Sequence, residues 1–264
     1  MITENKISNR LTNLFVEKNK ILSVYFTAGY PSLEDTGEII LLLQKYGVDS
    51  IEIGIPFSDP IAEGPVIEKA NIRALRVGTT TDKIFDMVKR VRTKTDIPLV
   101  FLTYMNPVFV YGVEKFFKNC RETSINGIII PDLPFEEKNE VLGVATSYDV
   151  DVITLIAPTS KDRIQTLAKD ATGFIYLVSS MGVTGVRSEI KTDINAIIAD
   201  IKQVSKTPVA VGFGISTTKQ AKEISKTADG VIVGSAIVRI VAEHGENAGS
   251  FLFDYVKSLK DAIL

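Results

Sequence analysis

Short apolar runs recur along the chain and alternate with segments whose apolar residues fall at helical spacing. An apolar run bounded by turn residues predicts a buried strand, and apolar positions at i, i+3, i+4 and i+7 predict a helix with one buried face. Continuous apolar strands are typical of a parallel sheet that is buried on both faces. Eight runs predict strands, at 21–27, 48–54, 98–103, 126–130, 151–156, 173–178, 208–211 and 230–233.

The segments between these runs predict eight or more helices. Ser32 with Asp35 resembles a capping box that opens the first of them, and Gly47 ends it. Thr81 is expected to cap a later helix. The apolar residues of segment 5–18 predict an additional N-terminal helix that plugs or flanks the core. The remaining helices are expected at 66–75, 113–123, 136–147, from 159, around 194–201, after 216, after 234 and over 248–263.

The number of strand–helix units predicts the fold. Eight units in about 250 residues is the count of a (β/α)₈ barrel. A doubly wound open sheet is the competing architecture, and the barrel is preferred because none of the predicted strands has the polar character of a sheet edge. No linker, charge block or low-complexity segment interrupts the 264 residues. We therefore expect an α/β fold in which residues 1–264 form a single (β/α)₈ TIM barrel domain with an extra N-terminal helix.

The composition narrows the class of protein. The chain is 45% hydrophobic and 23% charged, as in globular proteins. A net charge of −2 gives no reason to expect nucleic acid or an anionic membrane as a partner. The single cysteine, Cys120, excludes an intramolecular disulfide and is compatible with a reducing cytosol. The N-terminus has no apolar signal core, and no apolar run reaches the roughly 20 residues that cross a bilayer, so we expect a soluble cytoplasmic protein.

The stretch 50–65, with the sequence SIEIGIPFSDPIAEGP, contains three carboxylates: Glu52, Asp59 and Glu63. It begins as a strand in which the two isoleucines point to one side and Glu52 to the other. A carboxylate in an apolar strand is costly unless it is paired or used. Glu52 is therefore either a buried acid held by hydrogen bonds or a general acid/base, and the proline-rich loop that follows favours the second role. In a barrel, Glu52 would point into the mouth, where active sites lie.

Glycines follow three consecutive predicted strands, at 182–185 (GVTG), 212–214 (GFG) and 234–235 (GS). Barrels commonly bind phosphate with the loops after strands seven and eight, where exposed backbone N–H groups favour an anion. One such glycine alone is better explained as a helix-entry turn, but three groups at consecutive loops favour a phosphate site. The segment 212–214 lacks the third glycine of a dinucleotide-binding fingerprint.

The residues that are missing also constrain the chemistry. No lysine lies in or at the end of a predicted strand, which argues against Schiff-base aldol chemistry. One histidine and one cysteine argue against a transition-metal site, and His244 is interpreted as a surface residue. Asp132 ends the fourth strand between two prolines and is interpreted as a cap or turn residue. The residues thus predict a barrel that binds an organic phosphate and performs acid/base chemistry with carboxylates.

Six motifs occur in order over essentially the whole chain: 51–65, YMNP at 104–107, PDLP at 131–134, YLVSSMGVTG at 176–185, GFGIS at 212–216 and GSAIV at 234–238. They resemble the tryptophan synthase alpha subunit family, and the first motif is highly specific. The resemblance implies retro-aldol cleavage of indole-3-glycerol phosphate to indole and glyceraldehyde 3-phosphate, at the last stage of tryptophan biosynthesis. An aldol bond next to an indole can use the ring as its electron sink, so this chemistry requires neither a Schiff base nor a metal.

The resemblance also implies roles for individual residues. Glu52 falls on the catalytic carboxylate, which protonates the indole carbon at the bond being broken or takes the proton of the glycerol hydroxyl. Glu63 falls on the second acid, which holds the indole N–H as positive charge develops. The substrate pocket is expected to contain Tyr25, Leu102, Ile129 and Tyr176. The phosphate site is expected to contain Gly185, Phe213, Gly214, Gly234 and Ser235.

Glu63 departs from the family motif, which has Asp at this position. The side chain is one methylene longer, and a displacement of about 1 Å at a reacting centre can cost on the order of 10²-fold in rate. Either the loop re-seats Glu63, or the protein cleaves slowly and mainly binds and regulates. Asp59 is a possible substitute, although Asp beside a proline more often sets a turn. A different phosphate-binding barrel isomerase or synthase is the remaining alternative.

The resemblance implies a partner as well. This is a pyridoxal-phosphate-dependent beta subunit, which receives indole through a channel in an α2β2 heterotetramer. Pyridoxal phosphate would belong to the partner, so no cofactor is expected in this chain. The loops 55–65 and 179–190 are expected to close over the substrate and to report its presence to the partner.

Overall fold

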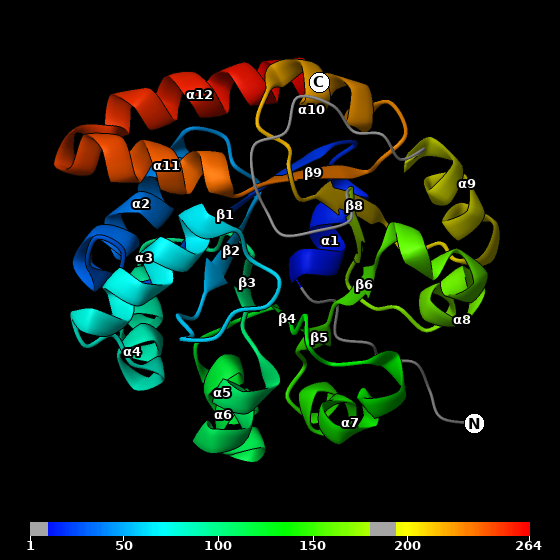
Figure 1. Ribbon diagram of the computed structural model, residues 1–264, viewed down its shortest axis with the longest axis horizontal. Helices are drawn as coiled ribbons and strands as arrows, with labels where there is room; N and C mark the ends of the chain where they lie inside the picture. Colours follow the sequence, from blue (N-terminus) through cyan, green and yellow to red (C-terminus); the bar gives the residue numbers. More distant parts are fainter. Residues whose placement is uncertain (1–9, 180–193) are drawn as a thin grey trace.

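In the computed structural model, a ring of parallel strands is surrounded by helices (Figure 1). The structure describes residues 10–179 and 194–264. Paired strands follow the order β5-β4-β3-β2-β1-β9-β8-β7-β6. The strands are β1 (Ile21–Thr27), β2 (Ser50–Gly54), β3 (Leu99–Leu102), β4 (Gly127–Ile129), β5 (Asp151–Val152), β6 (Thr154–Ile156), β7 (Ile175–Val178), β8 (Val209–Gly212) and β9 (Gly230–Val233).

The ring closes through a single stretch of chain. β5 and β6, which form the two ends of the strand order, are separated only by Ile153. β5 pairs with β4 and β6 pairs with β7, and the N–H of Ile153 donates to the carbonyl of Ile128 (2.9 Å). β5 and β6 together are therefore the fifth predicted strand. The eight predicted strands are confirmed, and they form the predicted (β/α)₈ barrel rather than an open sheet.

The helices cover the outside of the ring (Figure 1). They are α2 (Leu33–Lys45), α3 (Pro65–Arg76), α4 (Thr81–Val91), α5 (Met105–Tyr111), α6 (Val113–Glu122), α7 (Asn139–Ser147), α8 (Ile164–Lys169), α9 (Ile194–Val204), α10 (Thr218–Ser225), α11 (Ser235–His244) and α12 (Ala248–Ile263). None of the helices in the described ranges is long and apolar enough to cross a membrane. That residues 1–264 form a single domain stays a prediction.

Several helix starts differ from the sequence predictions. α4 is capped by Thr80, whose hydroxyl accepts from the N–H of Lys83 (3.4 Å), so the prediction of Thr81 as the cap was wrong by one residue. α5 was not predicted from the sequence. Its Pro107 is tolerated because it lies in the first helical turn. The segments 135–137 and 158–163 form 3₁₀ turns before α7 and α8.

α1 (Arg10–Glu17) closes the N-terminal end of the barrel. Leu11 is completely buried, and the ring of Phe15 lies 5.7 Å from the ring of Phe174, which precedes β7. Of the two predicted placements, the structure thus shows the plug. Residues 5–9 of the predicted helix lie outside the described residues.

A buried carboxylate ties the first and last helices to the same end of the barrel. The side chain of Asp49, which follows α2, is fully buried. It accepts from the N–H of Leu22 (2.8 Å) and from the ammonium of Lys18 (2.5 Å), and it is also paired with Lys260 in the last turns of α12. One side chain therefore joins β1, the loop before β2 and both flanking helices.

Candidate active site

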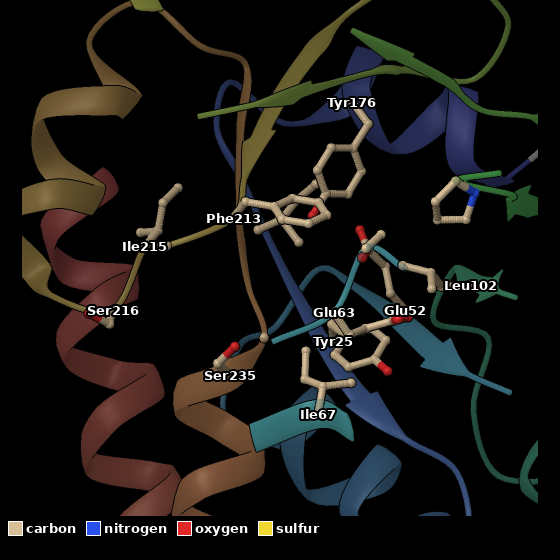
Figure 2. Close-up of a pocket in the computed structure, with 15 residues that line it drawn as sticks. Tyr25, Glu52, Glu63, Ile67, Leu102, Tyr176, Phe213, Ile215, Ser216 and Ser235 are labelled. Carbon is tan, nitrogen blue, oxygen red and sulfur yellow. The ribbon is translucent and has the colours of Figure 1, made fainter. Parts of the chain in front are cut away.

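A cavity opens at the carboxyl ends of the strands, inside the ring (Figure 2). Nine predicted site residues line it: Tyr25, Glu52, Glu63, Leu102, Tyr176, Phe213, Gly214, Gly234 and Ser235. Six further residues line it that had no predicted role: Ala62, Ile67, Pro131, Ile215, Ser216 and Ile232. The strand ends and the loops after them thus bring together residues that are more than 200 positions apart in the sequence.

The register of the strands sets the floor of this cavity. Tyr25 of β1 pairs with Glu52 of β2, so their side chains lie next to each other on the same face of the sheet. Ile51 and Ile53 point to the opposite face and are fully buried. The prediction that Glu52 points into the barrel mouth is therefore confirmed.

Glu52 is a deeply buried acid at the floor of the cavity. Its side chain is 1% exposed, and neither carboxylate oxygen has a partner within the described residues. The nearby hydroxyl of Ser23 donates to the carbonyl of Ser50 (3.4 Å). Burial raises the pKa of Glu52 to about 8, and the interaction with the Ser23 hydroxyl lowers the pKa by less than burial raises it. These contacts argue against the first of the two interpretations of Glu52, a buried acid held in place by hydrogen bonds, and favour the general acid/base.

Glu63 is buried in a different way. Its carboxylate accepts a hydrogen bond from the hydroxyl of Tyr104 and faces Asp132. Burial raises the pKa of Glu63 to about 7, against the lowering effect of the Tyr104 hydrogen bond, and the negative charge of Asp132 adds to the increase. Burial therefore favours the protonated form of both acids, and more strongly for Glu52 than for Glu63.

Two carboxyl groups in one cavity that differ in their contacts can take different roles, one as a proton donor and the other as an anion. A protonated Glu52 can deliver a proton, and an ionised Glu63 can stabilise positive charge or accept an N–H hydrogen bond. The rings of Tyr25, Tyr176 and Phe213 line the same cavity (Figure 2). A lining of this kind strengthens both functions when the bound substrate displaces water.

Glycines allow the two tyrosines to approach the sheet. A Cβ on Gly54 would overlap the hydroxyl of Tyr25, and a Cβ on Gly212 would overlap the hydroxyl of Tyr176. Both glycines end strands, and both tyrosine hydroxyls are therefore held close to the backbone of the neighbouring strand. Burial raises the pKa of each tyrosine well above its usual value, so both remain protonated hydrogen-bond donors at neutral pH.

The glycine-containing loops form the other end of the cavity. Gly234 precedes α11 and Ser235 is its first residue, so backbone N–H groups at a helix N-terminus line the cavity. Phe213 and Gly214 both have left-handed backbone conformations, with φ of 68° and 76°. For Phe213 this is a strained conformation of the kind that clusters at functional sites. Gly185 lies outside the described residues.

Other predicted residues lie elsewhere. Ile129 is fully buried and does not line the cavity, so its contact with substrate stays a prediction. Asp59 is exposed and bonded to Ser58, which fits a turn residue and not a substitute acid. Asp132 caps α5, because its carboxylate accepts from the N–H of Met105 (2.9 Å). His244 ends α11 half-buried, with its ring stacked 3.6 Å from that of Phe251.

Two cavity features were missed in the sequence. Tyr104 lies inside the YMNP motif, but the motif itself gives no reason to connect it with Glu63, which is 41 positions away. Ser216 lines the cavity, and its hydroxyl is buried without a partner in the described structure. The only hint in the sequence was its place two residues after the GFG segment. No group of three or more His, Cys, Asp or Glu residues that could hold a metal occurs in residues 10–179 and 194–264.

The fold and the site define a (β/α)₈-barrel protein in which paired acidic side chains face a glycine-lined helix N-terminus. Residues 11–261 match the sequence profile of the family described as tryptophan synthase alpha chain. The chain is 43% identical to the tryptophan synthase alpha chain of Lacticaseibacillus casei, covering 97% of this chain and 96% of that one. It is 44% identical to that of Thermoanaerobacter sp. (strain X514), covering 98% and 100%. The chain therefore belongs to the tryptophan synthase alpha chain family.

Solved structures agree with this assignment. The tryptophan synthase alpha chain of Legionella pneumophila superposes with a TM-score of 0.86 at 33% identity, over 97% of each chain. A structure described as the tryptophan synthase α2β2 complex from Pyrococcus furiosus, studied for mutual activation, superposes with a TM-score of 0.84 at 34% identity, over 91% of this chain and 98% of that one.

Proposed function

We propose that this chain is the lyase subunit of tryptophan synthase and cleaves indole-3-glycerol phosphate to indole and glyceraldehyde 3-phosphate. One observation carries the proposal: Glu52 and Glu63, two buried acids with raised pKa values, face the same cavity as the N-terminus of α11. An acid, an anion and a phosphate-binding helix end are the groups that this reaction needs. Family membership over residues 11–261 supports the same activity.

Glu52 starts the reaction as its general acid. It gives its proton to the indole carbon that bears the glycerol chain, which leaves positive charge on the ring nitrogen. The glycerol hydroxyl next to the ring then loses its proton to the Glu52 carboxylate and becomes the aldehyde of glyceraldehyde 3-phosphate. The bond between the ring carbon and the glycerol carbon breaks, and its electron pair returns to the ring to form indole. Glu52 is thereby protonated again.

Glu63 accepts a hydrogen bond from the indole N–H and stabilises the positive charge that develops on the ring. This role needs an ionised Glu63, whereas the first step needs a protonated Glu52. Cleavage should therefore depend on pH as a bell with limbs near 7 and 8, the two pKa values.

The remaining lining residues place the substrate. Tyr25, Leu102 and Tyr176 contact the indole end, and Ile129, which pairs with Leu102 in the neighbouring strand, belongs to the same pocket. The phosphate is bound by backbone N–H groups and the Ser235 hydroxyl at the start of α11. The other members of the phosphate site are Phe213, Gly214, Gly234 and Gly185.

The chain acts with a partner. The Pyrococcus furiosus relative is described as part of an α2β2 complex. We propose the same assembly here, with a beta subunit that binds pyridoxal phosphate and receives indole, in the cytoplasm, and with no cofactor in this chain. The contact of Glu63 with the cavity supports a functioning lyase over the alternative of a weakened regulatory subunit.

Indole release from indole-3-glycerol phosphate by the purified chain tests the proposal. It is measured with and without the beta subunit, beside Glu52→Ala and Glu63→Gln. We expect cleavage that rises with the partner and falls at least 10²-fold in each variant, roughly the cost of losing a preorganised acid or charge-stabilising group. Substrate binding without indole release would favour the regulatory alternative, and a product with the substrate carbon skeleton intact would favour an isomerase.

A further inference from the structure

We propose that Tyr104 is a positioning residue for Glu63, and that it fixes the loop after β2 against the loop after β3 so that the Glu63 carboxylate faces the cavity. The inference rests on the proposed function, because it assigns a task to Glu63 in that reaction. Tyr104 does not itself line the cavity, whereas Glu63 does. Tyr104 therefore acts through Glu63 and not on the substrate.

The hydroxyl of Tyr104 makes two hydrogen bonds of opposite sense with neighbouring residues. It accepts from the N–H of Ala62 (3.0 Å) and donates to an oxygen of Glu63. Because the Ala62 N–H occupies the oxygen of the phenol, the phenol proton is directed to the carboxylate. Tyr104 thus bonds to both the backbone and a side chain of the segment 62–63.

The ring of Tyr104 makes a third contact with that loop. It packs against the ring of Phe57, with centroids 5.1 Å apart, and Tyr104 is 2% exposed. Phe57 and Glu63 lie at the two ends of the loop after β2. Because the buried Tyr104 ring contacts both ends of the loop, the loop has few alternative positions. A reacting group such as Glu63 needs a fixed position of this kind.

Tyr104 is itself anchored from the next strand. The N–H of Met105 donates to the carboxylate of Asp132, which follows β4 (2.9 Å). The loops after β2, β3 and β4 are thereby joined through two consecutive residues, Tyr104 and Met105. The long Glu63 side chain, which could otherwise adopt several rotamers, is held by a rigid group that the barrel itself positions.

The hydrogen bond also favours the ionised form of Glu63, which the proposed role requires. A donated hydrogen bond stabilises a carboxylate and lowers its pKa. The titratable groups of the described residues that face Glu63 are Tyr104, Asp132 and Tyr25. Asp132 opposes ionisation by its charge, and both tyrosines stay protonated at neutral pH. The hydrogen bond from Tyr104 is the larger of two interactions that offset burial, and the second is a backbone hydrogen bond at Glu63 itself.

The test is Tyr104→Phe, measured as the pH dependence of indole release by the full chain with its beta subunit. Tyr148→Phe is the matched control, because Tyr148 donates the same kind of hydrogen bond to Glu114 at the surface. We expect Tyr104→Phe to lower kcat by roughly 10- to 100-fold with a smaller change in KM, and to move the acid limb to higher pH. Tyr148→Phe should change neither.

Three results overturn the inference. They are a wild-type kcat, a wild-type acid limb despite a lower kcat, and equal effects of Tyr104→Phe in the wild-type and Glu63→Gln backgrounds. A purely structural role would lower kcat or thermal stability without moving the limb. Non-additive effects of Tyr104→Phe and Glu63→Gln, in contrast, would confirm that the two residues act as a unit.

A measurement on the unmodified tyrosine keeps the inference testable if Tyr104→Phe does not fold. In the chain labelled with ¹³C at the tyrosine ring, one resonance should titrate near pH 7 in the wild type and not in Glu63→Gln. Identical tyrosine titrations in both proteins would refute the pairing. Because this readout needs no turnover, it decides the inference even if the wild type fails to cleave the substrate, which would refute the proposed function alone.

Discussion

Replacing Glu52 by Gln should remove activity and at the same time stabilise the protein at alkaline pH. Gln keeps the size of the side chain but cannot ionise. The pKa of Glu52 is about 8 in the folded protein, against 4.5 as the reference for an unfolded chain. Between these values the folded state holds one proton more than the unfolded state. The free energy of unfolding therefore falls as pH rises through this window.

The size of the effect follows from the two pKa values. Each pKa unit corresponds to about 1.4 kcal/mol, so ionisation of Glu52 costs the folded state up to about 5 kcal/mol above pH 8. Gln cannot ionise, so the folded state of Glu52→Gln does not lose this stability at alkaline pH. For a chain of this length, 1 kcal/mol changes Tm by roughly 2–4 °C, so the advantage of Glu52→Gln should grow by roughly 10 °C or more between pH 5 and pH 9.

The assay is denaturant unfolding of both proteins at a series of pH values, with indole release measured in parallel. Glu38→Gln, on the exposed face of α2, is the control and should follow the wild type at every pH. Glu63 titrates in both proteins, so its contribution cancels in the comparison. A stability difference that does not change between pH 5 and pH 9 would refute the conclusion that Glu52 is buried with a raised pKa.

Three further variants test other parts of the structure. Gly54→Ala should destabilise the fold by about 1–3 kcal/mol and impair cleavage, because its Cβ overlaps the Tyr25 hydroxyl. Thermal unfolding measures the first effect and indole release the second. Wild-type values in both assays would contradict the close contact between Tyr25 and Gly54. Asp49→Asn should cost about 1.5–3 kcal/mol in urea unfolding with little change in kcat, since it weakens charged hydrogen bonds far from the cavity. Ser235→Ala should raise KM about 10-fold with a smaller effect on kcat, and the reverse pattern in steady-state kinetics would argue against a phosphate contact.

The strands could be predicted from the sequence because a buried parallel strand is an uninterrupted apolar run. The pattern could not show that Ile153 divides the fifth strand, since that division depends on which neighbour each half pairs with. Helix starts were less reliable for a similar reason. Thr80 and Thr81 are equally good caps by composition, and only the backbone conformation distinguishes them.

The site residues likewise divide into those that the sequence could identify and those that it could not. Glu52 could be identified because a carboxylate interrupts an apolar strand, and the glycines because they follow strand ends. Tyr104 could not be assigned, because its partner Glu63 is brought near only by the pairing of β2 with β3. The separated pKa values of the two acids also depend on burial and contacts that no local pattern contains.

The pairing of Asp49 with two lysines has a consequence for when, during synthesis, the buried carboxylate can obtain both of its partners. One lysine, Lys18, precedes Asp49 by 31 residues, whereas Lys260 of α12 follows it by 211 residues. A chain that lacks α12 would bury this carboxylate with only one of its two lysine partners. Correct burial of Asp49 therefore depends on the packing of α12, and a chain in which this helix is lost or does not pack should be recognised by quality-control proteases.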